Sequence, residues 1–311
     1  MAWLEITVNT ASKDVEDVAA RLPARGYADL VIEDQAEFES FLEKNRAYWD
    51  YIDDEFQKKL EGLSRIKLYL EEGDEAGLAR LRDTVAELGL TMEAKPLPET
   101  DWEESWKDSY PPQEVGENLV VLPYWLAEEK TEKKKIILDP GLTFGTGAHP
   151  STQMVMEAME QRVQPGWHCL DLGSGSGILS ITALRLGAQS AVGVDIDPKA
   201  EDIARENAAI NQIFADRFTA VTGDVIGDRA MMESLKGHYD VVLANIVADV
   251  IIPLSRVVPE FLQEDSIFIC SGILNTRLAE VLDALEKNGL QILSTEQQED
   301  WCRVTAALAE A

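Results

Sequence analysis

The chain has 311 residues, of which 45% are hydrophobic and 27% are charged, and both fractions are ordinary for a soluble globular protein. At roughly 150 residues per domain, this length predicts two domains and excludes a peptide hormone or a bare recognition motif. The 57 acidic residues outnumber the 28 basic ones and give a formal net charge of -29 at pH 7. Because DNA phosphates repel such a surface, direct DNA binding is not expected, whereas cationic partners are attracted.

Cysteine spacing and apolar windows indicate where the protein resides. Cys169, Cys270 and Cys302 are far apart and lack the paired spacing of a zinc site or a disulfide framework. The N-terminal residues contain no basic segment before an apolar one, and no window approaches the ~18 apolar residues of a membrane span. We therefore expect a cytoplasmic protein without a bound metal and without membrane association.

Residues 1–97 are predicted to form an α+β, ferredoxin-like domain with the element order β-α-β-β-α-β. Apolar residues alternate with polar ones in the predicted strands and recur at helical spacing in the predicted helices. An acidic, aromatic, helix-like insertion at residues 35–59 separates the two middle strands. The predicted strands are 4–8, 30–32, 66–70 and 91–97, and the predicted helices are 15–22 and 78–88.

Residues 98–112 are predicted to link this domain to a second one at 113–311. The stretch from Pro96 to Pro112 contains four prolines and no periodic apolar face. Trp102 and Trp106, at i, i+4 spacing, are expected to hold a linker helix against one of the domains; contact with a substrate chain is the alternative. The apolar segments that follow, 119–122 and 136–138, predict two strands of a hairpin.

The remainder of the chain alternates between apolar strands and helices. This order predicts an α/β fold, a doubly wound, Rossmann-like sheet of about seven strands with helices on both faces. The predicted helices are 151–162, 177–186 and 198–212, and the predicted strands are 168–172, 190–196, 239–244, 267–270, 290–293 and 301–308.

A glycine-rich turn joins the first of these strands to a helix and reads LDLGSGSGI from Leu170 to Ile178. The third glycine follows the second after one residue, whereas a dinucleotide fold requires G-x-G-x-x-G. The spacing D-x-G-x-G-x-G is typical of S-adenosylmethionine-dependent methyltransferases. Asp171 is then expected to contact the methionine end of that cofactor, directly or through water, and Gly173 and Gly175 allow the backbone to approach it.

Two further strand ends carry candidate functional residues. Asp195 lies 22 residues after Gly173, and its carboxylate can accept hydrogen bonds from ribose hydroxyls, although NAD is bound in the same way. Asp197 followed by Pro198 is interpreted as a helix N-cap. Asn245 ends an apolar strand, where its carbonyl oxygen can orient an incoming amine as a catalytic group; a structural turn asparagine is the alternative.

The segment from Leu138 to Thr152 reads LDPGLTFGTGAHPST. Together with LDLGSGSGIL, VDIDP and ANI, it resembles the ribosomal protein L-eleven (L11) methyltransferase family of class I S-adenosylmethionine-dependent protein methyltransferases. The resemblance implies that Thr152, Gly173, Asp195 and Asn245 contact the cofactor and that the loop from Phe144 to Gly147 closes over it. The full set of expected cofactor-binding residues is Phe144, Gly145, Thr146, Thr152, Asp171, Gly173, Gly175, Asp195 and Asn245.

The resemblance also implies a reaction and a partner. The first domain would bind ribosomal protein L11 of the large subunit, and the second would transfer methyl groups from S-adenosyl-L-methionine to its α-amine and lysine ε-amines. The enzyme would be a monomer. His149, beside this loop, is interpreted as a capping or packing residue, with a general base as the alternative.

Three other functions stay open on the sequence alone. The first is a small-molecule amine N-methyltransferase, and the second is a ribosome-assembly binder that retains the cofactor fold without catalysis. The third, an NAD-dependent oxidoreductase, is disfavoured by the glycine spacing.

Overall fold

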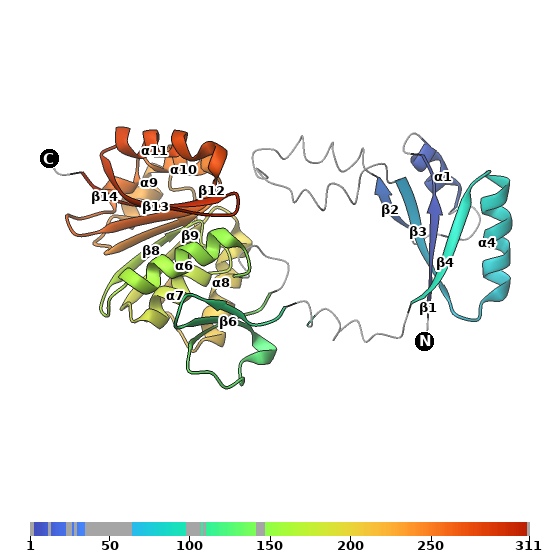
Figure 1. The fold of residues 1–311 in the computed structure, drawn as a ribbon, viewed down its shortest axis with the longest axis horizontal. Coiled ribbons are helices and arrows are strands. Elements are labelled where there is room, and N and C mark those ends of the chain that lie inside the picture. The colour runs from blue at the N-terminus through green and yellow to red at the C-terminus, as the bar shows by residue number, and fades with distance from the viewer. Residues whose placement is uncertain are drawn as a thin grey trace. The chain divides into compact units, whose positions relative to one another are not determined.

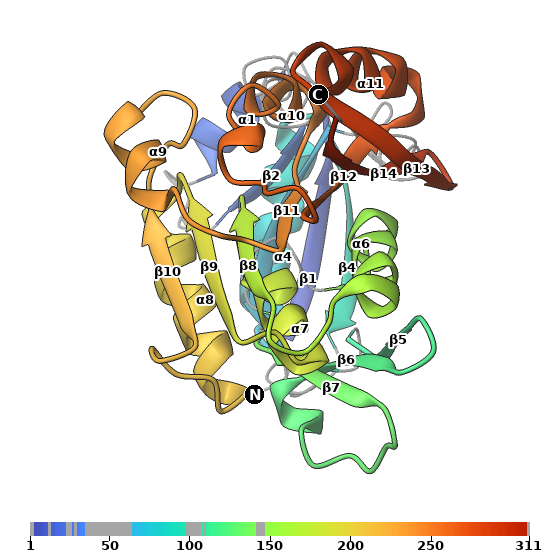
Figure 2. The same cartoon turned by 90° about the vertical axis from the view of Figure 1, so that its left-hand side faces the viewer.

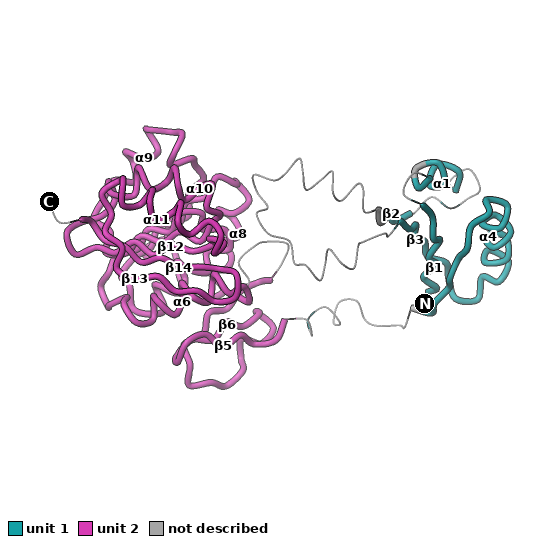
Figure 3. The backbone as a smooth tube through the Cα atoms, turned by 45° about the horizontal axis from the view of Figure 1, so that its top comes forward, with its two compact units in different colours: residues 1–109 teal, residues 110–311 magenta. Residues whose placement is uncertain are grey.

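The computed structural model describes residues 3–11, 14–22, 27, 30–34, 64–97, 107, 110–140 and 147–309. The chain divides into two compact units, Met1–Ser109 and Tyr110–Ala311 (Figure 3). The division falls within the stretch expected to act as a linker. The predicted insertion at 35–59, as well as Trp102 and Trp106, lies outside the described residues.

Four strands and two helices are described in the first unit (Figure 1). They are β1 (Trp3–Asn9), α1 (Val15–Arg21), β2 (Val31–Asp34), β3 (Ser64–Glu71), α4 (Glu75–Glu87) and β4 (Thr91–Leu97). The strands form an antiparallel sheet in the order β2-β3-β1-β4. Alternation places Ile6, Val8, Ile66 and Leu68 on one sheet face, where they are buried with apolar residues of both helices. Among the described residues of this unit, the order β-α-β-β-α-β is the one predicted from the sequence.

The second unit is built on a seven-stranded sheet (Figure 2). Its strands are β8 (His168–Leu172), β9 (Ser190–Asp195), β10 (Phe218–Thr222), β11 (Val241–Asn245), β12 (Ile267–Leu274), β13 (Leu290–Gln298) and β14 (Trp301–Leu308). The order is β10-β9-β8-β11-β12-β14-β13, parallel from β10 to β12, with β14 antiparallel to both of its neighbours. The predicted doubly wound α/β sheet is confirmed.

Strand β10 has no counterpart among the predicted strands. It lies at the edge of the sheet, where Thr219 and Thr222 are exposed while Phe218 and Ala220 are buried. An edge strand needs no continuous apolar segment, and the signal used for the central strands is therefore absent here.

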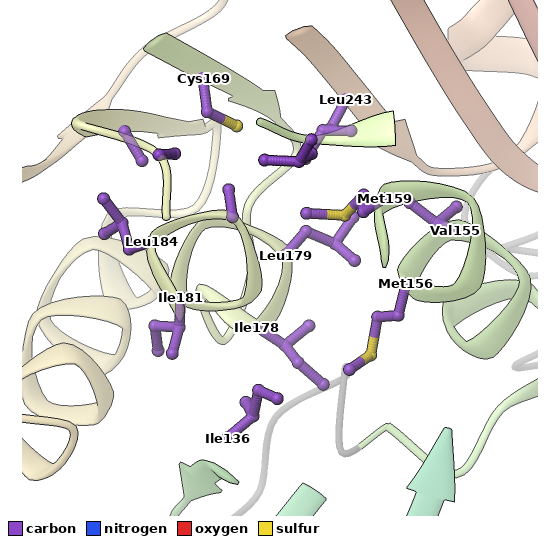
Figure 4. Packing of buried hydrophobic residues seen from close by; sticks show 14 of the residues in the cluster. Ile136, Val155, Met156, Met159, Cys169, Ile178, Leu179, Ile181, Leu184 and Leu243 are labelled. Carbon is purple, nitrogen blue, oxygen red and sulfur yellow. The ribbon is translucent and has the colours of Figure 1, made fainter. Parts of the chain in front are cut away.

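Helices cover both faces of this sheet. They are α6 (Pro150–Arg162), α7 (Ile178–Leu186), α8 (Pro198–Ile210), α9 (Arg229–Leu235), α10 (Ala248–Leu254) and α11 (Leu278–Lys287), with the short 3-10 helices η5 (Val258–Glu260) and η6 (Asn275–Arg277). One buried layer contains residues of α6, α7 and α8, among them Ile178, Leu179 and Met159 against Cys169 and Leu243 of the sheet (Figure 4). The other contains residues of α9, α10 and α11. None of the described helices combines the length and apolar character that crossing a membrane requires.

The predicted hairpin at 119–122 and 136–138 is wrong. A separate small sheet contains β5 (Gln113–Val115), β6 (Leu119–Pro123) and β7 (Lys134–Leu138), and β6 pairs with β7 in parallel. Parallel strands cannot be joined by a tight turn. The connection here includes the 3-10 helix η4 (Tyr124–Leu126) and the charged residues after it.

Candidate functional site

The glycine-rich turn follows β8 directly and leads into α7. Gly173 and Gly177 both have a φ of +78°, a left-handed conformation that disfavours other residues. A Cβ at Gly173 would lie 2.5 Å from Cγ2 of Ile246, and one at Gly177 would lie 3.0 Å from Cβ of Ala204. Backbone conformation and internal packing therefore already require glycine at these two positions, in addition to the approach of a ligand that the sequence predicts.

Asp171 lies beneath this turn, and its side chain is fully buried. Its Oδ2 accepts hydrogen bonds from the backbone N–H of Ser180 at 3.0 Å and from its hydroxyl at 2.8 Å. No described group donates to Oδ1. Burial raises the pKa of Asp171 to about 6, although the bonds from Ser180 favour the ionised form. Since a buried oxygen without a partner is unfavourable, Oδ1 is suited to accept a hydrogen bond from a ligand.

This raised pKa predicts a pH-dependent stability. The folded chain retains the Asp171 proton up to about pH 6, whereas the unfolded carboxyl loses it near pH ~4. The group's contribution to stability therefore declines as the pH rises through this window, by on the order of 3 kcal/mol in total. We expect Asp171→Asn, which cannot ionise, to gain unfolding free energy relative to the parent chain between pH 4 and pH 7. Denaturant unfolding of the two ligand-free proteins at several pH values measures this free energy. If the two unfolding free energies change in parallel with pH, Asp171 does not have a raised pKa.

Asp195 ends β9, next to β8 in the sheet. Its Oδ2 accepts the backbone N–H of Gly175 at 2.8 Å, and its Oδ1 accepts the backbone N–H of Asp197 at 3.0 Å. One carboxylate thus holds the glycine-rich turn and the start of the segment that leads into α8. Each oxygen retains a further lone pair, so both can still accept a hydroxyl from a ligand.

Asn245 ends β11, on the other side of β8. Its Nδ2 donates to Oγ1 of Thr152 at 2.9 Å, and Thr152 is buried in the first turn of α6. This bond uses the amide nitrogen of Asn245 as its donor. Because Oδ1 and Nδ2 point in different directions from the same carbon, the bond also fixes the orientation of the carbonyl oxygen. Asp171, Asp195 and Asn245 therefore come from three neighbouring strands, at or near the carboxyl edge where ligands bind in open α/β sheets.

Both residues predicted to cap helices are confirmed in that role. Nδ1 of His149 accepts the backbone N–H of Ser151 at 3.2 Å and caps α6, and Oδ1 of Asp197 accepts the backbone N–H of Lys199 at 2.9 Å and caps α8. The His149 ring also meets Trp301 edge-on, with ring centroids 4.6 Å apart. Burial lowers the pKa of His149, so the neutral ring that capping requires is favoured.

Comparison with known proteins identifies the family. The sequence profile described as Ribosomal protein L11 methyltransferase (PrmA) matches residues 2–308. The ribosomal protein L11 methyltransferase of Alkaliphilus metalliredigens is 37% identical over 325 residues, which cover 99% of this chain and 98% of that protein. This chain belongs to the ribosomal protein L11 methyltransferase family. The relative of the same name from Caldicellulosiruptor bescii is also 37% identical, over 98% of this chain and 99% of its own.

A solved structure agrees with this membership. The crystal structure of ribosomal protein L11 methylase from Lactobacillus delbrueckii subsp. bulgaricus is similar with a TM-score of 0.58 and 31% identity. The matched region covers 65% of this chain and 100% of the chain in that crystal structure. As a member of the L11 methyltransferase family, this chain is a protein methyltransferase that depends on S-adenosylmethionine. The resemblance seen in the sequence is confirmed.

The described residues fit this cofactor chemically. S-adenosylmethionine carries an amino group and ribose hydroxyls, which are hydrogen-bond donors, and the site offers the unpaired Oδ1 of Asp171 and the remaining lone pairs of Asp195 as acceptors. Phe144, Gly145 and Thr146 lie outside the described residues. Gly147 is described, with a φ of +87° and side-chain atoms of Val121 about 3 Å from where its Cβ would be.

Sequence reasoning missed one candidate contact, Ile196. This side chain follows Asp195 directly and is 70% exposed, the largest exposure among the described large hydrophobic residues. Apolar surface beside a carboxylate suits a ligand that combines a flat ring with a sugar. The available signal was the isoleucine between two aspartates in VDIDP, where a solvent-facing segment would ordinarily be polar.

Proposed function

We propose that this chain methylates amino groups of ribosomal protein L11, namely its α-amine and lysine ε-amines. Family membership supports L11 as the substrate, and it disfavours the small-molecule and non-catalytic alternatives. The hydrogen bond between Asn245 and Thr152 supports amine chemistry most directly, because it holds an amide carbonyl at the carboxyl edge of the sheet. The protein acts as a cytoplasmic monomer in this proposal.

The proposed cofactor contacts are those of the described strand ends and of the turn. Asp195 accepts the ribose hydroxyls, Oδ1 of Asp171 accepts a donor at the methionine end directly or through water, and the turn lies against the ligand. The described residues in this set are Thr152, Asp171, Gly173, Gly175, Asp195 and Asn245.

Asn245 orients the substrate in this proposal. When bound, S-adenosylmethionine supplies a methyl group on a positively charged sulfur. A substrate ammonium has no lone pair, so the amine must be neutral before it reacts, and a desolvated site lowers its pKa in that direction. Oδ1 of Asn245 then accepts an N–H bond from the neutral amine and holds its lone pair in the reactive direction.

The first unit, with proposed boundaries 1–97 and a linker at 98–112, binds the ribosomal protein in this proposal. The sheet face opposite the buried core carries Trp3 and Tyr69, whose exposed fractions are 41% and 40%. Exposed aromatic side chains of this kind are enriched in protein interfaces. The net charge of -29 also attracts a basic substrate, and this effect on the association rate should weaken with salt.

Transfer of labelled methyl groups to purified L11 tests the function. We expect the intact mass of L11 to increase in steps of one methyl group, and peptide mapping to place the steps on the α-amine and on lysines. Asp195→Ala is the inactive control.

Two results would contradict parts of the proposal. If the parent chain binds cofactor but L11 gains no mass, the substrate assignment is wrong. If Trp3→Ala combined with Tyr69→Ala leaves the KM for L11 unchanged, the sheet face that carries these two residues does not bind the substrate.

A further inference from the structure

Two buried asparagines at the C-terminal end of α8 reach the outer edge of β7: Asn207 lies within the helix and Asn211 is its C-cap. Oδ1 of Asn211 accepts the backbone N–H of Ile137 at 3.0 Å, and its Nδ2 donates to the carbonyl of the same residue at 2.6 Å. Four residues earlier in the chain, Oδ1 of Asn207 accepts at 2.9 Å the backbone N–H of Asp139, the residue that follows β7. Both asparagines are 1% exposed.

The spacing of these contacts follows from helix and strand geometry. Four helical residues rise by about 6.0 Å, and two strand residues by about 6.6 Å. Asn207 and Asn211 therefore match the positions of Asp139 and Ile137, and the two amides take the place of a neighbouring strand. Backbone groups that a strand would otherwise pair are satisfied by side chains of a helix.

Only Asn207 also reaches the glycine-rich turn. Its Nδ2 donates to the carbonyl of Ser176 at 2.9 Å, and Ala204, three residues earlier on α8, is the residue against which Gly177 packs. The second donor bond of Asn211 goes instead to the carbonyl of Asn207 within the helix, at 2.8 Å. One buried amide thus joins the end of β7 to the turn. Its neighbour joins β7 to the end of α8 and accepts from Arg185 of α7, but does not reach the turn.

We propose that Asn207 is a positioning residue for cofactor binding. Its amide holds the Ser176 carbonyl, and with it the backbone of the turn, at a fixed distance from the end of β7. The Asp195 carboxylate holds the same turn through Gly175. The turn is therefore anchored at adjacent residues by two side chains from different elements, and Asn207 itself is not among the proposed cofactor contacts. The proposal rests on the cofactor site proposed above.

Asn211 provides the comparison, because it has the same residue type and the same burial and also bonds backbone groups at the end of β7. In the full-length chain we would compare Asn207→Leu with Asn211→Leu, measuring the Kd of S-adenosylhomocysteine by calorimetry and the Tm of each ligand-free variant. Both variants should lose Tm, since each leaves two backbone groups without their partners. These groups are the N–H and carbonyl of Ile137 for Asn211→Leu, and the N–H of Asp139 and the carbonyl of Ser176 for Asn207→Leu. Only Asn207→Leu should raise the Kd, by roughly tenfold, and kcat at saturating cofactor should stay close to that of the parent chain.

Equal changes in Kd for the two variants, or an unchanged Kd for Asn207→Leu, would overturn the proposed role. Failure of the parent chain to bind S-adenosylhomocysteine would contradict the cofactor site itself, so the two failures are distinguishable. If the leucine variants do not fold, Asn207→Ser and Asn211→Ser provide the same comparison with a shorter polar side chain, which places no methyl groups against the backbone groups that lose their partner. For the serine variants too, the proposed role requires a raised Kd for Asn207→Ser alone.

Discussion

Replacing Asp195 with alanine is expected to weaken binding of S-adenosylhomocysteine by at least ~100-fold, since a hydrogen bond to a charged group contributes about 1.5–3 kcal/mol and more than one is lost. The loss has two causes. The proposed acceptors for the ribose hydroxyls disappear, and the backbone N–H groups of Gly175 and Asp197 lose the carboxylate that holds them. Calorimetric titration of the purified chain measures the change in Kd.

Asp195→Asn separates these two causes. The asparagine amide keeps one acceptor oxygen, which can still hold the turn through Gly175, but it has neither the charge nor the second acceptor. Its Kd should therefore lie between those of the parent chain and Asp195→Ala. If Asp195→Ala binds the ligand within about threefold of the parent chain, a difference below ~1 kcal/mol, then Asp195 is not a cofactor ligand.

Loss of the Asn245 amide is expected to act mainly on turnover. With both substrates saturating, Asn245→Ala should lower kcat by roughly 100-fold, because an amine that is not oriented rarely presents its lone pair in the reactive direction. The rate of methyl transfer to L11 at saturating concentrations of both substrates measures this kcat. Unchanged turnover at saturation would show that the orienting role is wrong.

Thr152 provides a second test of this prediction, made at saturating cofactor because Thr152 is also a proposed cofactor contact. Thr152→Val has nearly the same shape but lacks the Oγ1 that accepts from Asn245, whereas Thr152→Ser keeps that hydroxyl. We expect the valine variant to have a lowered kcat, as Asn245→Ala does, and the serine variant to retain most of the kcat of the parent chain. Equal activity of the two variants would mean that the hydrogen bond does not orient the amide.

The sequence by itself determined the features that depend on neighbouring residues. The turn from Gly173 to Gly177 is set by strand, glycine and helix signals within a dozen residues, and the caps at His149 and Asp197 bind N–H groups two residues away. The central strands were also recognisable, because burial on both faces requires uninterrupted apolar side chains. These features were predicted correctly because their physical causes are local.

Only the tertiary structure decided which distant residues meet. The Thr152 to Asn245 bond spans 93 residues, and the Asn207 contact with Asp139 spans 68, so no local pattern indicates either. The direction of β7 was mispredicted for the same reason, since two apolar segments pair equally well in a hairpin or in parallel until the rest of the fold places them. Short-range sterics and hydrogen bonding thus determined the glycine-rich turn and the helix caps. The packing of α6 and α8 against the sheets determined how the distant residues of the site come together.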